Sequence, residues 1–506
     1  MSLPVLSVLT LLPLAGGIIV LLLGRPAARA TALAFATASV AFVLFLWSRF
    51  QPAAAGMQFE ELHPWEPAIG FGYHLGLDGL GLLMLAVSSI VVLMSLAASW
   101  SNAKQGPAYF ALLLFLETGL FGTFTALNFL HWFLYWELSL IPAFFLVRIW
   151  GGAGRARAAT QFFVYTMVGS IALLLAFLAI FLASGSFDFV ELTGMAQRGE
   201  LATAIAHQWH SGNMGMVLFC GAFLGFAVKT PVVPFHGWLA SAYSEAAPET
   251  TMALTGALSK MGVYGFLRIL LPIFPGEMER ARNILLWLAI ASIVLPAFTA
   301  WAQKDLKKML AYSSINHLGY CLLGIAAVAN SSKLGAGMMS AKAAALTGVM
   351  LQVFSHGVTA AALFWFLALL ARRSGGETGL NEFGGLRRAM PTFCGLMGIS
   401  LFASLGLPGL IGFPGEFLIF RGVFPLDRGA AALAVPGLLM TAVFLLTLVE
   451  RVFSGPLHDR WSGMPDLSLA ERCMIAPAIV LMFVVGLYPQ LISGILQGAV
   501  LSLVRY

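Results

Sequence analysis

Long apolar stretches separated by short polar segments dominate the chain. A helix that crosses the hydrocarbon core of a membrane needs about 20 apolar residues, and on that measure the pattern predicts about fourteen membrane-spanning helices. They lie at residues 4–23, 30–49, 79–99, 107–127, 129–149, 160–183, 214–234, 249–273, 283–302, 307–328, 338–371, 389–423, 429–453 and 471–503. The first stretch has no basic segment before it and no small-residue cleavage site, so we expect a retained span rather than a signal peptide.

Helix-breaking residues interrupt two of these spans. Residues 226–238, FAVKTPVVPFHGW, place Pro231 and Pro234 just after Lys229, and residues 405–417, LGLPGLIGFPGEF, place prolines and glycines beside Glu416. Proline lacks an N–H and clashes with the carbonyl four residues back, so it opens the helix. In a membrane, opened backbone persists only where protein or a water-filled cavity satisfies it. We therefore expect broken helices at both places, and spans 338–371 and 389–423 are too long for one straight crossing.

The position of the two breaks predicts an internal repeat. The fold class is an all-α polytopic membrane protein in which spans 4–8 and spans 9–13 form two five-helix units, each broken at its fourth helix. Because five is odd, the units would be inverted relative to each other in the membrane, as in many transporters. The predicted organisation is residues 1–106 for the N-terminal spans, 107–273 and 283–453 for the two units, and 454–506 for the C-terminal span.

Composition and charge support a membrane protein. The chain is 59% hydrophobic and 10% charged, whereas a soluble domain has about a quarter charged residues. The net charge of +6 is modest for 506 residues and gives no reason to expect nucleic acid as a partner. The four cysteines, Cys220, Cys321, Cys394 and Cys473, have no metal-site or CxxC spacing, so we expect buried packing residues.

The basic residues are distributed unequally over alternate loops. Of the 28 lysines and arginines, 16 lie in or beside the loops after spans 1, 3, 5, 9, 11 and 13, and 9 lie on the opposite side. The first group includes Lys104, and the second includes Lys333. By the positive-inside rule, this distribution predicts both termini on the non-cytoplasmic side.

Several ionisable residues fall inside predicted spans. A charge at the bilayer centre costs roughly 2.5–3.5 kcal/mol, so such groups pair with one another or line a hydrated path. One interpretation is a series of inter-helix ties, and the other, which a series of groups spread over many spans favours, is a proton relay. The residues are Glu117, Glu137, Lys229, Lys260, His317, His356 and Glu416.

Four further polar positions have narrower interpretations. His236, just past Pro234, is a proton-path residue or an interfacial anchor, with the path favoured. Asp78 is expected to cap a helix, and Arg268 is expected to extend to the membrane interface. The segment 313–317, SSINH, is a water wire or a set of inter-helix hydrogen bonds.

Seven strings of the sequence together resemble a known family. The strings are HLGLDGLGLLML, YWELSLIPAFFLVRIWGG, FFVYTMVGSIALLLA, FLGFAVKTPVVPFHGWL, LSKMGVYGFLRI, DLKKMLAYSSINHLGY and LGLPGLIGFPGEFLIFRG, spread from about residue 74 to 421. They are similar to the antiporter-like proton-pumping subunits of respiratory complex I, the NADH:quinone oxidoreductase. Glu416 on the broken twelfth helix is typical of the subunit 4, or chain M, type, because the sister subunits usually carry lysine there.

The resemblance implies a role for each of these residues. Glu137 and Lys229 would be the input pair, Lys260 and His317 the central relay with His356 beyond them, and Glu416 the terminal site. Glu117 and His236 join them as candidate relay residues. The subunit would hold no flavin, iron–sulfur cluster, quinone or metal. It would sit among sister antiporter-like subunits in an energy-transducing lipid bilayer, most readily a bacterial inner membrane, and move protons by redox energy released in those partners.

Some positions depart from the family pattern. Ala240 and Ser241 replace a Pro-Asp pair, and Asn128 stands where an acidic group is frequent. These departures leave other assemblies open: a ferredoxin-using photosynthetic relative, a membrane-bound hydrogenase or a carbon-uptake complex. The main alternative within transport is a stand-alone or Mrp-type cation/proton antiporter. An alternative of another class is a non-conducting structural membrane subunit.

Overall fold

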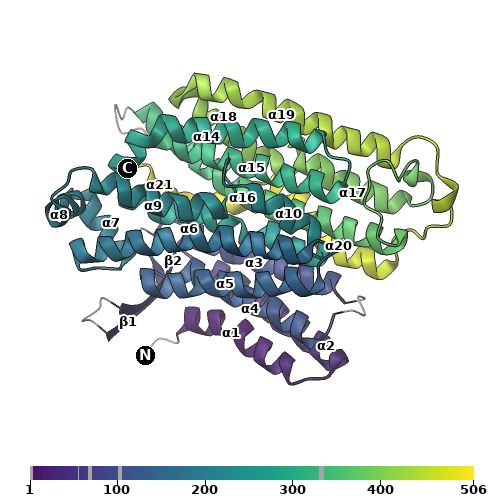
Figure 1. Cartoon of the computed structure of the whole chain (residues 1–506), viewed down its shortest axis with the longest axis horizontal. Coiled ribbons are helices and arrows are strands. Elements are labelled where there is room, and N and C mark those ends of the chain that lie inside the picture. The colour runs from purple at the N-terminus through teal and green to yellow at the C-terminus, as the bar shows by residue number, and fades with distance from the viewer. Residues whose placement is uncertain (1–3, 55, 67–70, 101–104, 330–335, 506) are drawn as a thin grey trace.

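The apolar stretches form a bundle of long helices that run side by side (Figure 1). The computed structural model describes residues 4–54, 56–66, 71–100, 105–329 and 336–505. Lys104 and Lys333, two of the charges used to orient the chain, lie outside them. The all-α class is confirmed except for one hairpin. The longer helices are α1 (Val5–Leu21), α2 (Arg25–Arg49), α3 (Gly79–Ala98), α4 (Pro107–Thr125), α5 (Phe129–Trp150), α6 (Arg155–Ser184), α9 (Met214–Lys229), α14 (Pro275–Trp301), α15 (Leu306–Val328), α16 (Ala336–Ser374), α17 (Pro391–Ser404), α18 (Gly412–Leu426), α19 (Arg428–Leu448), α20 (Leu469–Leu487) and α21 (Gln490–Leu503).

The predicted eighth span is a composite helix. It runs from Pro248 to Ile273 and contains α11 (Pro248–Ala253), α12 (Lys260–Gly265) and α13 (Leu271–Ile273). Two π-helical turns, η2 (Leu254–Leu258) and η3 (Phe266–Leu270), separate these parts. Such turns are rare and are found mostly at functional sites, and Lys260 begins the segment between them.

Ten helices in the described residues are long and apolar enough to cross a membrane, or eleven if a bent pair is counted as one span. Four predicted spans do not meet this criterion of length and apolar composition, and each has a physical reason. α1 has only 17 residues, α15 carries polar residues, and the other two spans are broken into shorter helices. The count of fourteen therefore stays a prediction. The bent pair is α8 (Glu200–Trp209) and α9, which meet at 106°.

Both predicted helix breaks are present. α9 ends at Lys229 and α10 (Gly237–Glu245) continues after the proline segment, while α17 ends at Ser404 and α18 begins at Gly412. The last predicted span also divides, because α20 and α21 meet at Tyr488 and Pro489. In contrast, α16 is one continuous helix of 39 residues, about 58 Å at 1.5 Å per residue.

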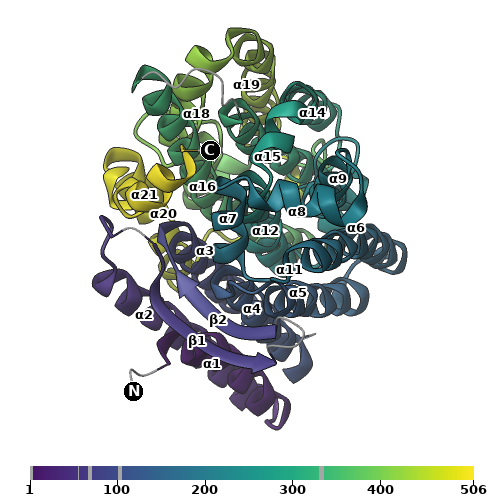
Figure 2. The same cartoon turned by 90° about the vertical axis from the view of Figure 1, so that its left-hand side faces the viewer.

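A two-stranded antiparallel hairpin, absent from the prediction, lies across one end of the bundle (Figure 2). Its strands are β1 (Gln58–Glu66) and β2 (Phe71–Leu77). Glu61 ties it to the start of α1, accepting from the backbone N–H of Leu6 at 2.7 Å. His74 ties it to Asp188, which caps α7 (Phe189–Gln197) through the backbone N–H groups of Val190 and Glu191.

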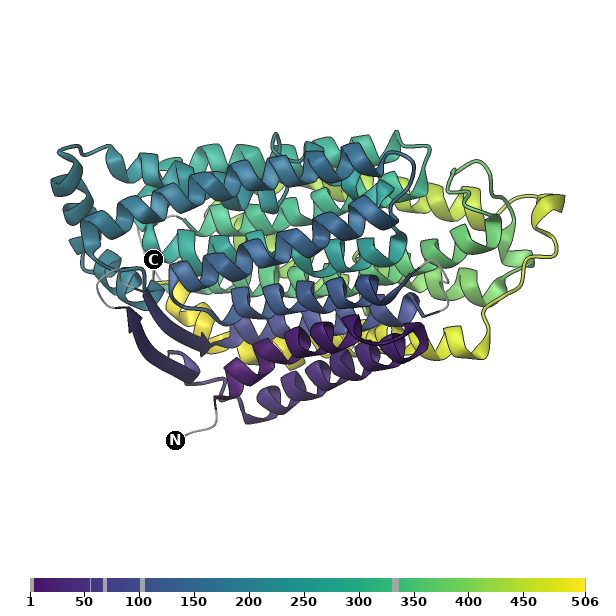
Figure 3. The same ribbon diagram turned by 60° about the horizontal axis from the view of Figure 1, so that its bottom comes forward.

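Loops that the charge pattern assigns to one side do lie together. The Glu245 carboxylate, just before span 8, accepts from the backbone N–H of Gly154 at 2.8 Å. The Lys307 ammonium group donates to the Ser244 carbonyl at 3.4 Å, and Arg373 pairs with Glu471 at 2.7 Å. Both termini lie at the opposite end, with the hairpin (Figures 1 and 3).

Three residue-level predictions are tested directly by the contacts. Asp78 caps α3 as expected, accepting from the backbone N–H of Gly81 at 3.0 Å. Arg268 does not extend to the interface: it is mostly buried, pairs with Asp78 and donates to the Tyr264 hydroxyl at 3.2 Å. Cys220 and Cys473 are exposed rather than buried. Hydropathy identifies a span but not the face on which a side chain lies.

Candidate functional site

Two glycines bring Lys260 and His356 together. Gly256 on η2 and Gly357 on α16 face each other, and a Cβ built on Gly357 would lie 2.9 Å from the Gly256 carbonyl oxygen. Without side chains at these positions the two helices approach closely, and Lys260 Nζ lies 2.7 Å from His356 Nδ1. Both side chains are buried.

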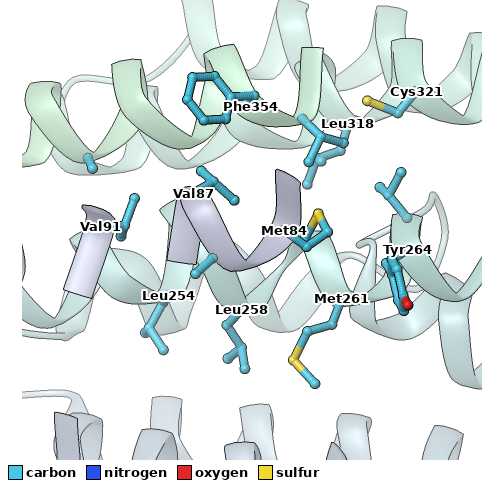
Figure 4. Packing of buried hydrophobic residues seen from close by; sticks show 14 of the residues in the cluster. Met84, Val87, Val91, Leu254, Leu258, Met261, Tyr264, Leu318, Cys321 and Phe354 are labelled. Carbon is cyan, nitrogen blue, oxygen red and sulfur yellow. The ribbon is translucent and has the colours of Figure 1, made fainter. Parts of the chain in front are cut away.

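Apolar side chains pack against the two glycines: an ideal Cβ would lie 2.6 Å from Val91 Cγ1 at Gly256 and 2.4 Å from Val87 Cγ2 at Gly357. Figure 4 shows Val87 and Val91 of α3 between Leu254 of η2 and Phe354 of α16. These packed side chains exclude solvent and lower the local dielectric, which strengthens electrostatic interactions between buried groups. The helices that carry the pair are therefore joined by apolar packing beside it.

The π-helical turn η2 supplies Lys260 with a second partner. Lys260 Nζ donates to the backbone carbonyl of Thr255, five residues earlier, and the Ser259 hydroxyl donates to the same carbonyl at 3.2 Å. The Thr255 hydroxyl lies 3.1 Å from that of Ser314 on α15. In the SSINH segment, Ser314 thus forms the inter-helix hydrogen bond of one interpretation.

His317 on α15 extends this cluster toward Glu416. Its ring centre lies 5.2 Å from that of His356. Its Nε2 lies 3.1 Å from the Ser404 hydroxyl at the end of α17, and its Nδ1 lies 3.3 Å from Glu416 Oε1. The side chains of Lys260, His356, His317 and Glu416 therefore form a series across four spans, with polar contacts at its two ends and neighbouring imidazole rings at its middle.

Small residues also position Glu416 against α16. A Cβ on Gly348 or Gly415 would clash with backbone of the facing helix, at 2.5 Å from Ile419 N and 2.8 Å from Gln352 N. Gly406, in the break, has φ +79°, and its ideal Cβ would lie 2.5 Å from Glu416 Oε2. The broken segment thus places a glycine where the carboxylate needs room.

Glu137 and Lys229 form a separate cluster. Lys229 is 2% exposed, and its Nζ lies 4.8 Å from the ring centre of Trp136, the neighbour of Glu137 on α5. Such a cation–π contact stabilises a desolvated ammonium group by about 2 kcal/mol. Glu137 acts electrostatically on Lys229, yet in the described part of the chain no ion pair joins the two at contact distance.

Two of the candidate residues lie outside both clusters. Glu117 on α4 is fully buried, and neither of its carboxylate oxygens has a hydrogen-bond partner. Its polar neighbour is Ser39 on α2. His236 is half-buried in the break after α9, and its Nδ1 is also without a partner. The residues of the predicted single relay therefore lie in one series of four neighbouring side chains, one separate pair and two isolated groups.

The positions that depart from the family pattern lie at two different places in the structure. Asn128 caps α5, accepting from the backbone N–H of Leu130 at 3.1 Å, so an amide serves there in place of a carboxylate. Ala240 and Ser241 line a cavity of about 400 Å³ at the basic-loop end of the bundle. Arg157, Lys308 and Glu245 line the same cavity. The cavity is therefore polar, and it lies beside α10.

Reasoning from the sequence missed two participants, Gln352 and Ser404. Gln352 Nε2 lies 3.2 Å from His317 Nδ1 and 3.3 Å from Glu416 Oε1. Both residues are neutral, so a search for charges in apolar stretches passes over them. The available signal was that Gln352 stands one helical turn before His356 and therefore shares its face. Within the described residues no group of three or more His, Cys, Asp or Glu is arranged to hold a metal ion.

The fold and this buried series define a class: multi-pass helical membrane proteins with two broken helices and ionisable residues at their centre. Residues 126–441 match the family described as NADH:quinone oxidoreductase/Mrp antiporter, TM, and the chain belongs to that family. The NADH-quinone oxidoreductase subunit M of Rhodobacter capsulatus is 33% identical over 99% of this chain and 96% of its own length. The predicted family is thereby confirmed.

Solved structures share the fold. A chain of respiratory complex I from Thermus thermophilus with bound NADH has a TM-score of 0.84 at 29% identity, covering 99% of both chains. A chain of the Mrp complex from Dietzia sp. has a TM-score of 0.82 at 21% identity, covering 100% of this chain and 98% of that one. The latter likeness concerns the fold alone.

Proposed function

We propose that this chain is the proton-translocating, M-type membrane subunit of a complex I-type NADH:quinone oxidoreductase. The observation that carries the proposal is the series of neighbouring ionisable side chains Lys260, His356, His317 and Glu416 inside an apolar bundle. The relatives named NADH-quinone oxidoreductase subunit M support the choice of complex. The chain itself would hold no redox cofactor, and redox energy would come from partner subunits.

The series suits stepwise proton transfer. A protonated Lys260 donates to His356 Nδ1 over 2.7 Å, and the imidazolium so formed passes a proton toward His317. His317 Nδ1 then donates to Glu416 Oε1 over 3.3 Å, leaving a neutral imidazole and a carboxylic acid. At each step one group loses and the next gains one proton. The Lys260–His356 and His317–Glu416 contacts are within hydrogen-bond reach, and the step between the two imidazoles joins rings whose centres are 5.2 Å apart.

The separate pair and the cavity extend the path at its input. Changing the charge of Glu137 alters the free energy of protonating Lys229, because charges in a low-dielectric interior interact strongly. The cavity lined by Ser241, Glu245 and Lys308 lies at the basic end of the bundle, which the positive-inside rule assigns to the cytoplasm. We infer that protons enter there and leave beyond Glu416, with sister antiporter-like subunits as neighbours in a bacterial inner membrane.

The test compares Lys260→Met and Glu416→Gln with a matched control in the assembled complex. Arg421→Gln is the control, because Arg421 lies on α18 with Glu416 but is exposed. We expect both relay variants to assemble and to lose redox-driven proton pumping in membrane vesicles, while the control pumps normally. A structural subunit predicts the reverse: failed assembly, with normal pumping in any complex that forms.

A second measurement addresses the alternative function as an Mrp-type antiporter, because this chain shares its fold with a chain of the Mrp complex. The purified chain alone in vesicles should show no sodium-dependent proton flux if its transport depends on a redox partner. Sodium-driven flux by the isolated chain would favour the antiporter function over the one proposed here.

A further inference from the structure

Gln352 occupies the junction between His317 and Glu416. It is 2% exposed and lies on α16. Its Nε2 is 3.2 Å from His317 Nδ1 and 3.3 Å from Glu416 Oε1, and those two atoms are themselves 3.3 Å apart. One amide nitrogen therefore contacts both partners of a single proton-transfer step.

The chemistry of the amide fixes the state of its neighbours. An amide NH₂ has two hydrogens to donate and accepts none, and a carboxylate only accepts. The amide oxygen faces the Ser355 hydroxyl at 3.4 Å, whose one hydrogen it shares with the backbone carbonyl of Gln352 at 3.3 Å. His317 Nδ1 must then be the acceptor, so the imidazole is neutral with its hydrogen on Nε2, facing the Ser404 hydroxyl at 3.1 Å.

In this arrangement no proton can pass between His317 and Glu416. Both Nδ1 and Oε1 accept a hydrogen from the amide, and an amide N–H does not give up its proton near neutral pH. When His317 gains a second proton, both ring nitrogens become donors, and Nδ1–H then faces the amide N–H. The amide must turn away before Nδ1–H can donate to Oε1.

We propose that Gln352 is a positioning residue that gates proton transfer from His317 to Glu416. The inference rests on the proposed proton-translocating function. With the amide in place the two groups are insulated. After it turns, the proton leaves Nδ1 for Oε1, and a neutral imidazole and a carboxylic acid result. Because Nε2 already carries a hydrogen, the second proton on His317 binds at Nδ1, so the amide leaves Nδ1 as that proton arrives and the same movement exposes Nδ1–H to Oε1.

Two contacts of the amide bear on its movement. An ideal Cβ on Gly415 would lie 2.9 Å from Gln352 Oε1, so the glycine provides the room that the amide group occupies. The bond from Ser355 is long at 3.4 Å, which makes it a weak restraint. The main chain of Gln352 is fixed against α18 by the same glycine, so motion is confined to the side chain.

The experiment removes the amide without changing the volume of the site. Gln352→Met keeps the length of the side chain but cannot donate, and Gln352→Glu keeps the shape but can carry a proton. Thr359→Val is the control, because Thr359 is buried about two turns away on α16 and its hydroxyl bonds to backbone carbonyls of that helix. Whole complexes in vesicles are assayed for NADH:quinone turnover, protons moved per electron, and passive proton conductance under an imposed potential without NADH.

We expect both Gln352 variants to keep turnover and to leak. Losing one hydrogen bond in a buried network changes an equilibrium constant by about tenfold, so passive conductance should rise about that much and protons per electron should fall. The Thr359→Val complex should match the parent. Two outcomes overturn the gate: unchanged conductance and coupling in both variants, or a loss of transport with no leak, which would make the amide a conductor.

The controls also separate this inference from the proposed function. If Glu416→Gln and Lys260→Met pump normally, the relay itself is wrong. If those variants fail but Gln352→Met and Gln352→Glu behave like the parent, only the gate is wrong. Should the methionine variant fail to assemble, the glutamate variant, which is closer in shape, gives the same readout.

Discussion

At the scale of single residues, buried charge in this chain is compensated by partners from other helices. Arg268 pairs with Asp78, and Lys260 contacts His356 and a backbone carbonyl. Removing one partner of a buried ion pair costs about 3–5 kcal/mol, because the remaining charge is left uncompensated. Glu117 and Glu137 depart from this pattern, since both oxygens of Glu117 and Oε1 of Glu137 have no hydrogen-bond partner. Groups with such partners are structural as well as functional, so every relay variant needs an assembly control.

His74, outside the membrane-spanning segments, makes the attachment of the hairpin pH-dependent. Burial lowers the pKa of His74, but the hydrogen bonds to Asp188 and Glu60 and the charges of these carboxylates together raise it by more. The net pKa of His74 therefore lies above its usual value. A raised folded-state pKa stabilises the contact fully below about pH 6.5, and the stabilisation is lost as pH rises through the folded-state pKa. We expect the hairpin to be held most firmly in mild acid.

The measurement is hydrogen exchange of the amides of β2 and α7, corrected for the intrinsic pH dependence of exchange. A charge-assisted hydrogen bond stabilises by roughly 1.5–3 kcal/mol, so protection should fall about tenfold as His74 loses its proton. In a His74→Gln variant protection should be low and independent of pH over the same range. Equal pH dependence in the parent and the variant would exclude His74 as the cause.

At the scale of elements, the broken helix between α17 and α18 depends on glycines in the left-handed conformation. Gly406 has φ +79° and Gly409 has φ +92°. A side chain in that conformation costs roughly 1–2 kcal/mol at either position. Only at Gly406 would a Cβ approach Glu416 Oε2, whereas at Gly409 its nearest neighbour is Leu487 Cδ2 at 3.9 Å. The two glycines are thus matched in strain and differ in what they contact.

We therefore expect Gly406→Ala to reduce proton pumping and Gly409→Ala to spare it. Displacing a reacting group by about 1 Å can lower a rate as much as a hundredfold, so a fall of at least about tenfold is expected for Gly406→Ala. Pumping per assembled complex, with assembly measured by yield of the purified complex, checks this. Similar losses in both variants would mean that backbone strain, and not the position of Glu416, is responsible.

Much of this element-scale arrangement was predictable because its causes are local. Apolar length marks α2 to α6, and Pro231 and the glycines around Pro408 mark the breaks. The β1–β2 hairpin was missed because its stability comes from Glu61 and His74 contacting distant helices. Gln352 was missed because a neutral amide carries no charge signal. Arg268 was misplaced because Asp78, its partner, lies 190 positions earlier in the sequence and on another helix.

At the scale of the whole molecule, alternate loops collect at opposite ends of the bundle. The hairpin, α7, α8 and both termini share one end (Figures 1 and 2). The loops joined by Glu245 to Gly154 and by Arg373 to Glu471 share the other. This segregation places the cavity lined by Ser241 and Lys308 at the basic end, so the direction of transport depends on which end faces the cytoplasm.

The basic end should face the cytoplasm, because short loops rich in lysine and arginine are retained there during insertion. Alkaline phosphatase fused after Arg505 should then be active, and a fluorescent protein that folds only in the cytoplasm should stay dark at the same position. Fusions in the loop between α5 and α6, near Gly152, should behave in the opposite way, which controls for expression. An inactive phosphatase and a fluorescent reporter protein at Arg505 would instead place that end in the cytoplasm. Because both termini share an end, the orientation of the whole bundle in the membrane would then be reversed. Glu416 would then lie on the entry side of the relay, and the cavity would become its exit.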